Sequence, residues 1–208
     1  MSNPAADPAL TLDLNGFALG GKPVLGALSL SVSPGEVLAL TGPSGVGKTS
    51  LLRILAGLET GYTGQLHVPG RVAYVFQEPT LLPWRSLTDN LTLTTGISVS
   101  EAKHALDAVG LGGMGDRFPG ETSLGQQRRL SLARAFAHKP DVLLMDEPFV
   151  SLDPDLADEM MTLFETLHAG TELATVLVTH VETEAERLAS RILKLGGSPA
   201  RIVDPPPT

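Results

Sequence analysis

The chain has 208 residues, 42% of them hydrophobic, which suffices for one compact α/β domain with a small inserted lobe. The absence of cysteine excludes disulfides, thiolate metal sites and a catalytic thiol, and the formal net charge of -8 argues against a general nucleic-acid surface. No apolar run approaches the roughly 20 residues that span a bilayer, and the first residues do not resemble a signal peptide, so a soluble cytoplasmic protein is expected.

The first part of the chain predicts a strand, a turn and a helix, followed by two more strands. The apolar run 37–41 is typical of a buried strand, and a glycine-rich turn connects it to the helix-forming residues 48–57. The runs 64–68 and 71–76 have the composition of strands. Because Pro69-Gly70 separates these two runs, we expect them to form a hairpin.

The second part of the chain begins with a helical stretch and ends with alternating strands and helices. Residues 79–134 have an irregular helical pattern, interrupted by glycines, which predicts an inserted helical lobe. The apolar runs in "DVLLMDEP" and "ATVLVTH" lie on either side of a helix-like segment, 156–168, and "RILKL" predicts a last strand. This alternation is typical of βαβ units and of a mostly parallel sheet.

A phosphate-binding sequence lies between the strand 37–41 and the following helix. It matches G-x-x-x-x-G-K-[ST] in full, and the expected nucleotide-binding residues are Gly42, Pro43, Ser44, Gly45, Val46, Gly47, Lys48, Thr49 and Ser50. The glycines allow the backbone N–H groups to turn toward a phosphate, and the helix adds its positive N-terminal end. Lys48 is expected to reach the β- and γ-phosphates and Thr49 to bind Mg²⁺. The alternative is a glycine-rich turn with a solvated lysine.

Polar residues at the ends of three predicted strands are candidates for the chemistry on ATP. Asp146 and Glu147 end the strand in "VLLMDEP", where α/β proteins bind ligands; Asp146 is the expected Mg²⁺ ligand and Glu147 the expected general base. His180 could donate a hydrogen bond to the γ-phosphate, and Gln77 could contact the metal or the attacking water. Solvated acids and a structural histidine are the alternatives.

These motifs together predict a phosphate-loop NTPase of the α/β class. The expected fold has a mostly parallel sheet core, an antiparallel edge subdomain and an inserted helical subdomain. We expect a single domain over 1–208, in which 1–78 and 135–208 form the nucleotide-binding core, 79–134 form the helical subdomain, and 204–208 are a disordered tail. The chain has no N-K-x-D sequence for reading guanine, so a small GTPase is not expected.

Taken in chain order, these motifs resemble those of the ATP-binding cassette (ABC) ATPases, over nearly the whole chain. The specific match is residues 122–126, "TSLGQ", which align with the family sequence L-S-G-G-Q. The resemblance implies a two-lobed domain that dimerises head to tail around two ATP molecules, with Mg²⁺. It implies that Ser123, Gly125 and Gln126 contact the partner's nucleotide, that Asp153 crosses the dimer interface, and that His180 senses the γ-phosphate.

The resemblance further implies a transport function. Gln77 would link the nucleotide to a membrane subunit, and "FQEPTLLPW" is similar to importer ATPases of the nitrate, sulfonate and taurine group. The implied partners are transmembrane permease subunits, a second, identical ATP-binding subunit and a solute-binding protein, with no nucleic acid, on the inner face of the membrane. The alternatives are a soluble ABC-type ATPase acting on nucleic acid or ribosomes, and a nucleotide-binding module impaired in hydrolysis.

Two departures from the family pattern bear on the site. The signature has Thr122 in place of leucine and Leu124 in place of the first glycine; we expect the Leu124 side chain to pack within the helical lobe. A left-handed backbone at that leucine would cost about 1–2 kcal/mol. The aromatic that stacks on adenine is replaced by Leu19, so Phe17 or an apolar contact from Leu19 is expected to take its place.

Overall fold

The computed structural model describes residues 7–203, and the expected tail at 204–208 lies outside them. The chain divides into two compact units. The first combines Met1–Tyr74, Asp141–Glu147 and Gly170–Thr208, and the second combines Val75–Pro140 and Pro148–Ala169. The segment expected to form the helical subdomain lies in the second unit, which also includes residues 148–169.

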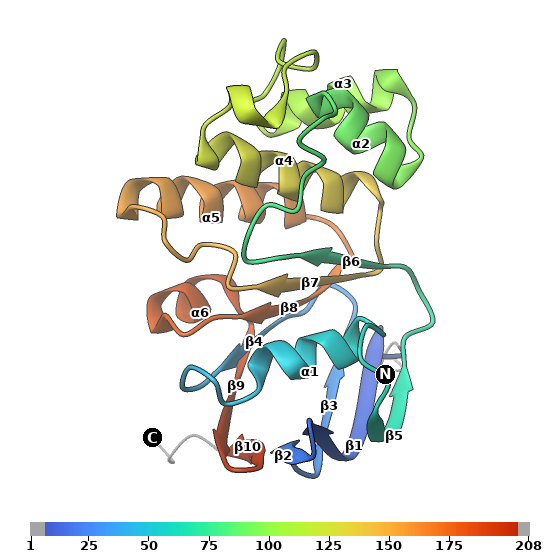
Figure 1. Cartoon of the computed structure of the whole chain (residues 1–208), viewed down its shortest axis with the longest axis vertical. Helices are drawn as coiled ribbons and strands as arrows, with labels where there is room; N and C mark the ends of the chain where they lie inside the picture. Colours follow the sequence, from blue (N-terminus) through green and yellow to red (C-terminus); the bar gives the residue numbers. More distant parts are fainter. Residues whose placement is uncertain (1–6, 204–208) are drawn as a thin grey trace, which may run out of the picture. The chain divides into compact units, whose positions relative to one another are not determined.

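A ten-stranded sheet organises the first unit (Figure 1). Its order is β3-β1-β2-β10-β9-β4-β8-β7-β6, with β5 paired to β1. The strands are β1 (Leu10–Leu19), β2 (Lys22–Leu25), β3 (Leu28–Val32), β4 (Val37–Thr41), β5 (Tyr62–His67), β6 (Val72–Val75), β7 (Val142–Asp146), β8 (Ala174–Val178), β9 (Arg191–Gly197) and β10 (Ala200–Val203). The last strand, β10, was not expected from the sequence.

The central strands β9, β4, β8 and β7 are parallel. Strands β7 and β8 are buried along their whole length, which explains why they are continuous apolar runs in the sequence. In the register, Val178 pairs with Leu40 on one side and with Asp146 on the other. The residues that follow β4, β7 and β8 therefore emerge at the same edge of the sheet.

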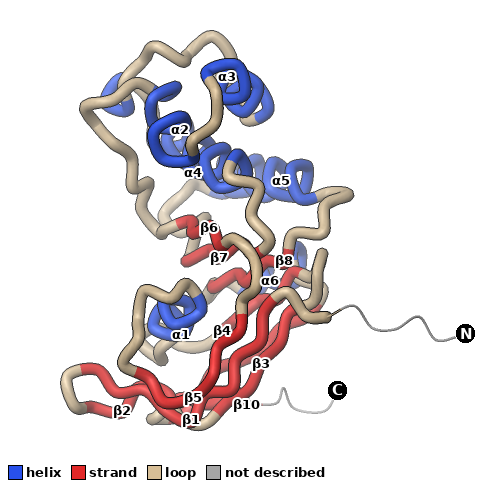
Figure 2. Tube along the Cα trace, turned by 90° about the vertical axis from the view of Figure 1, so that its right-hand side faces the viewer, coloured by secondary structure: helices blue, strands red, loops and turns tan. Residues whose placement is uncertain are grey.

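The expected hairpin of 64–68 with 71–76 is wrong. Strand β5 pairs antiparallel with β1, whereas β6 lies at the opposite end of the sheet beyond β7 (Figure 2). Asp141, just before β7, explains the difference: its carboxylate accepts a bond from Arg71 N at 2.7 Å, and its N–H donates to Arg71 O at 2.9 Å. These bonds direct the chain after Pro69-Gly70 toward β7 instead of back along β5.

Two helices of the first unit follow strands of the parallel sheet. Helix α1 (Lys48–Leu55) follows β4 and buries Leu51, Leu52 and Ile54 in the core of this unit. Helix α6 (Glu182–Leu188) follows β8 and packs against β4. Both helices therefore begin at the carboxyl ends of buried strands, the edge where ligands bind in parallel sheets.

The second unit is helical. Its elements are α2 (Leu87–Thr95), α3 (Val99–Ala108), the 3₁₀ turn η1 (Pro119–Glu121), α4 (Leu124–Ala137) and α5 (Pro154–His168). Apolar side chains of α2, α3 and α4 form one core, with Leu163 and Leu167 of α5 packed against it. Serine or aspartate caps the N-terminus of each long helix, and in α3 and α4 a Glu or Gln three residues later completes a capping box.

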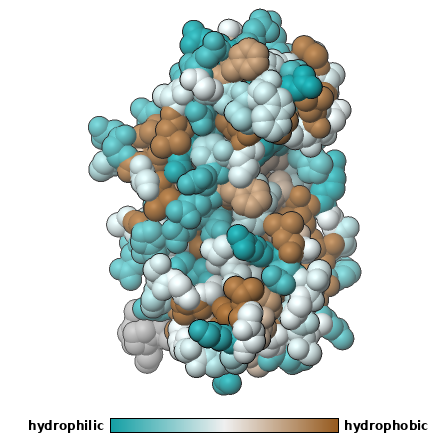
Figure 3. All heavy atoms as spheres, viewed as in Figure 1, coloured by the Kyte–Doolittle hydropathy of each residue, from teal (hydrophilic) through white to brown (hydrophobic). Residues whose placement is uncertain are grey.

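The described residues contain no helix that is both long and apolar enough to cross a membrane. Hydrophobic and hydrophilic residues are mixed over the face drawn in Figure 3. Isolated apolar side chains such as Trp84 and Leu58 are exposed, which is ordinary for a protein surface.

Candidate functional site

The phosphate loop, residues 42–47, connects β4 to α1 and depends on its glycines. Gly42, Gly45 and Gly47 have φ angles of 142°, 75° and 113°, a region that side chains disfavour. A Cβ on Gly42 would lie 2.5 Å from Leu195 O, and one on Gly47 would lie 2.8 Å from Leu25 Cδ2. The close packing and the positive φ angles explain why glycine occupies these positions. The loop leads directly into the N-terminus of α1, whose first N–H groups have no partner within the helix.

Lys48 is 4% exposed and its ammonium group lies inside the loop. Its Nζ donates hydrogen bonds to Gly42 O at 2.8 Å and to Pro43 O at 3.1 Å, and it lies 4.0 Å from Glu147 Oε1. The charge is thus held by main-chain oxygens within the turn. A phosphate group in the loop would meet a cation that is already oriented.

Asp146, at the end of β7, accepts two hydrogen bonds. Thr49 Oγ1 donates to its Oδ1 at 3.1 Å, and the Tyr74 hydroxyl donates to its Oδ2 at 3.1 Å. Burial raises the pKa of Asp146, although both hydrogen bonds oppose the shift. Burial and the nearby carboxylate also raise the pKa of Tyr74, which keeps its hydroxyl a donor. Tyr74 was not expected from the sequence, where it reads as an ordinary strand residue.

Glu147 directly follows β7 in a left-handed conformation, with φ at 45°. For a residue other than glycine this costs about 1–2 kcal/mol, so the surrounding structure must maintain it. Its N–H donates to Val178 O at 2.9 Å, and its Oε1 lies 3.3 Å from His180 Nδ1. The sharp turn thereby places the carboxylate between His180 and Lys48.

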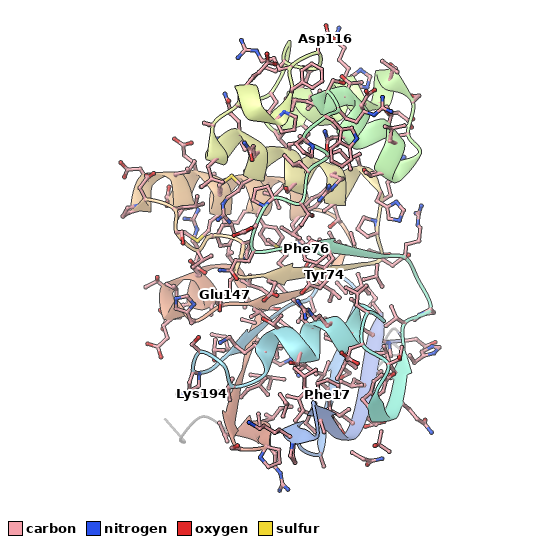
Figure 4. The ribbon with its side chains drawn as sticks, in the orientation of Figure 1. Phe17, Tyr74, Phe76, Asp116, Glu147 and Lys194 are labelled. Carbon is pink, nitrogen blue, oxygen red and sulfur yellow. The ribbon has the colours of Figure 1, made fainter. Side chains whose placement is uncertain are left out.

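A cavity of about 480 Å³ opens beside this group. It is lined by Thr41, Gly42, Pro43, Ser44, Glu147, His180, Glu182 and Lys194. Figure 4 labels Glu147 after β7 and Lys194 on β9. Lys194 pairs with Thr41 in the register, so an exposed lysine borders the phosphate loop. Neither Lys194 nor Glu182 was expected at the site, because their positions depend on the strand order and on α6.

The first unit thus brings together the phosphate loop, Asp146, Glu147 and His180. The other expected site residues belong to the second unit: Gln77, Ser123, Gly125, Gln126 and Asp153. Gln77 is exposed and follows β6. The expected site residues therefore fall into two groups, one in each unit.

The signature residues form the start of helix α4. Ser123 is its N-cap and accepts a hydrogen bond from Gln126 N at 3.2 Å, while Gln126 Oε1 accepts one from Ser123 N at 3.0 Å. Gln126 therefore stabilises the helix start through its side chain. A Cβ on Gly125 would lie 3.0 Å from Leu156 Cδ2, so α4 approaches the first turn of α5 closely here. Asp153 caps α5 by accepting from Leu156 N at 3.0 Å.

The expectation that the Leu124 side chain packs within the helical lobe is wrong. Leu124 is the first residue of α4 and is 47% exposed. It is absent from the described residues with positive φ, so the backbone here carries no left-handed strain. Helical side chains lean toward the N-terminus, so the first residue of a helix has no preceding turn to pack on, which is consistent with this exposure.

The two residues expected near adenine have opposite environments. Phe17 is 5% exposed and belongs to the core of the first unit. Leu19 is 59% exposed at the turn between β1 and β2. Of the two, Leu19 is the one with surface available to a base.

Comparison with known proteins agrees with this geometry. The model of the "ABC transporter" family matches residues 25–150, which include the phosphate loop, the signature, Asp146 and Glu147. The chain belongs to the ABC transporter family. The family that the sequence predicted is thereby confirmed, and with the relatives and solved structures described next so are the α/β phosphate-loop fold and the interpretation as an ATP-hydrolysing subunit of an ABC transporter.

Three similar relatives are each named aliphatic sulfonates import ATP-binding protein. The SsuB 2 protein of Burkholderia cenocepacia is 36% identical over 96% of the ABC chain and 78% of its own length. The SsuB 1 protein of Pseudomonas fluorescens is 46% identical over 84% of the chain and 68% of its own length. The SsuB 1 protein of Paracoccus denitrificans is 42% identical over 92% of this chain and 81% of its own length.

Solved structures show the same fold. A dimeric ATP-binding cassette bound to ADP and phosphate superposes with a TM-score of 0.80, covering 94% of this ABC chain and 97% of its own, at 24% identity. A metal-chelate type ABC transporter in an inward-facing conformation gives a TM-score of 0.83 at 24% identity. The match covers 95% of this chain and 84% of the transporter chain. At this identity the likeness concerns the fold.

Proposed function

We propose that this ABC subunit hydrolyses Mg²⁺–ATP to drive the uptake of aliphatic sulfonates through a membrane permease. The observation that carries the sulfonate assignment is the 36–46% identity, over most of the chain, to proteins named for sulfonate import. The geometry of the first unit supports the hydrolytic part. A structured phosphate loop, an oriented lysine and two consecutive carboxylates meet at one edge of the sheet.

Residues 42–50 would bind the nucleotide. The N–H groups of the loop and of the start of α1 would bind the phosphates, and Lys48 would release Gly42 O and Pro43 O to reach the β- and γ-phosphates. Leu19 would offer an apolar surface to the adenine. Lys194 and His180 add positive or hydrogen-bonding groups on the side where the cavity opens.

The residues present fit Mg²⁺. Thr49 Oγ1 and Asp146 Oδ1 lie 3.1 Å apart, so both oxygens can face one cation. No cluster of three or more His, Cys, Asp or Glu side chains suited to a metal occurs among the described residues. Magnesium is commonly held by one or two protein oxygens together with phosphates and waters, and Thr49 and Asp146 would supply two such oxygens. When bound, the cation neutralises charge on the phosphates.

Glu147 would act as the general base. Its carboxylate would accept a proton from the water that attacks the γ-phosphorus, while the bond from phosphorus to the β–γ bridging oxygen breaks and phosphate and ADP form. His180, whose Nδ1 lies 3.3 Å from Glu147 Oε1, would orient that carboxylate and contact the γ-phosphate. The left-handed turn at Glu147 would keep the carboxylate at the loop.

The second unit would complete the site of another subunit. The Ser123 hydroxyl, which has a hydrogen left to donate while its oxygen accepts from Gln126 N, and the Gly125 N–H would bind the γ-phosphate of the partner's ATP. Gln126 would support this helix start. Asp153 would lie at the interface. Gln77 would contact the metal or the attacking water. A homodimer then holds two equivalent sites.

The partners follow from the transport function. Two transmembrane permease subunits would receive the motion of the dimer, and a solute-binding protein would deliver the sulfonate. The subunit would work in the cytoplasm on the inner face of the membrane, through contacts with the permease.

Growth on different sulfur sources tests the sulfonate assignment. In the source organism, replacement of the gene by a Lys48→Met version is expected to abolish growth with ethanesulfonate as the only sulfur source and to leave growth with sulfate unchanged. Nitrate as the only nitrogen source provides the matched control for the neighbouring substrate class. Loss of growth on nitrate with normal growth on ethanesulfonate would contradict the assignment.

A further inference from the structure

Arg128 is a buried arginine whose guanidinium group binds main-chain oxygens. It lies on α4 and is 7% exposed. Its Nη1 donates to Pro148 O at 2.5 Å and its Nη2 to Val150 O at 2.8 Å. Burial lowers the pKa of Arg128, and the charge of Glu78 opposes this shift. Burying a charged group costs free energy unless it is hydrogen-bonded. The two hydrogen bonds to main-chain oxygens therefore indicate that Arg128 has a specific structural role.

The segment that Arg128 holds leads to Asp153. Residues 148–153 follow β7 and Glu147 and lead to Asp153, the N-cap of α5. Ser151 within them has a φ of 61°. A left-handed serine is strained and persists where its neighbours constrain it. Arg128 binds the carbonyl of Val150, directly before this serine, so it constrains the segment at its strained point.

The same helix carries the signature. Ser123 caps α4, and Gly125, one turn before Arg128, lies against Leu156 in the first turn of α5. Arg128 therefore supplies a second connection between the start of α4 and the residues around Asp153. Ser123 and Asp153 are among the residues of the second unit that the proposed function assigns to the dimer interface, together with Gly125.

We propose that Arg128 is a positioning residue that holds residues 148–153 against α4, so that Ser123 and Asp153 meet the partner's nucleotide as one rigid pair. The inference rests on the proposed function for the dimer, and on the hydrogen bonds within the second unit for the coupling. The fork of the guanidinium explains the choice of arginine: its donors have a fixed geometry that reaches two carbonyls, whereas a lysine is a single point of charge.

The test compares three variants in a Glu147→Gln parent. Arg128→Met keeps an apolar stem and removes all donors, and Arg128→Lys keeps the charge without the fork. Arg129→Met is the matched control, because Arg129 also connects α4 to α5, through Glu159 at 2.8 Å, and its other guanidinium bond goes to Val109 O at 3.2 Å. The measurements are binding of a fluorescent ATP analogue, ATP-driven dimerisation by light scattering, and amide hydrogen exchange of the free chain.

Both Arg128 variants are expected to bind nucleotide within about twofold of the parent, yet to need at least about tenfold more ATP for half-maximal dimerisation. Amide exchange of residues 148–153 should accelerate in both variants and stay unchanged in Arg129→Met. Parent-like exchange and dimerisation in the Arg128 variants would overturn the proposal. So would a parallel loss of nucleotide binding and of cooperative thermal unfolding, because Arg128 would then be a general support of the fold.

The exchange measurement separates this inference from the proposed function. If the Glu147→Gln parent fails to dimerise with ATP, the proposed dimer is wrong. Faster exchange at 148–153 in the free Arg128 variants would still support the coupling of this segment to α4, and unchanged exchange would overturn it.

Discussion

A chain carrying Glu147→Gln is expected to release phosphate from ATP at least about 100-fold more slowly than the wild type. Glutamine has nearly the same size as glutamate and can remain between His180 and Lys48, but it cannot accept a proton from the attacking water. Binding of ATP should persist, because the phosphate loop and Lys48 are unchanged. The measurement is the initial rate of phosphate release at saturating Mg²⁺–ATP, from wild type and variant assembled with the permease.

Asp158→Asn is a suitable control for this substitution. Asp158 lies on α5 in the second unit and is exposed, so the same change of carboxylate to amide is made outside the unit that contains the phosphate loop. Its rate should stay within about twofold of the wild type, since surface substitutions of this kind have small effects. Equal rates for the wild type and Glu147→Gln would show that Glu147 is not the base.

Lys48→Met is expected to weaken ATP binding by at least about tenfold. The substitution removes a buried cation that the loop holds at 2.8 Å from Gly42 O and 3.1 Å from Pro43 O, and with it the proposed partner of the β- and γ-phosphates. Titration with a fluorescent ATP analogue measures the dissociation constant. Lys103→Met, on an exposed turn of α3, is the matched control and should bind like the wild type.

The salt dependence of binding adds a second check on Lys48. A buried charge is poorly screened by salt, so the difference in affinity between the wild type and Lys48→Met should persist from low to physiological ionic strength. A variant that binds as tightly as the wild type would contradict the role given to Lys48.

The sequence predicted the parts of the site that are local in the chain. The phosphate loop was predicted because strand, glycines, lysine and helix follow one another within 37–57, and the glycines determine the backbone of the turn. Asp146 and Glu147 were predicted because they end an apolar run. That both then meet the loop depends on the parallel register, in which Val178 pairs with Leu40 and with Asp146.

The parts that depend on strand order could not be predicted in this way. Tyr74 contacts Asp146 only because β6 lies beyond β7, and the sequence favoured a hairpin of the β6 region with β5. Lys194 borders the loop because β9 pairs with β4 at Thr41. At Leu124 the family pattern drew attention to a missing glycine, whereas Leu124 begins α4 and is not among the described residues with a positive φ, so no glycine is required there.

Phosphate release by the assembled transporter, measured against the Mg²⁺ concentration, is the decisive measurement of whether this chain is a Mg²⁺-dependent ATPase. With saturating ATP, we expect release that follows the Mg²⁺ concentration and stops when EDTA removes the metal, since Thr49 and Asp146 are the proposed metal ligands. An Asp146→Asn chain should need far more Mg²⁺ for the same rate. Release that continues unchanged in EDTA, or an Asp146→Asn chain with the magnesium dependence of the wild type, would contradict the account.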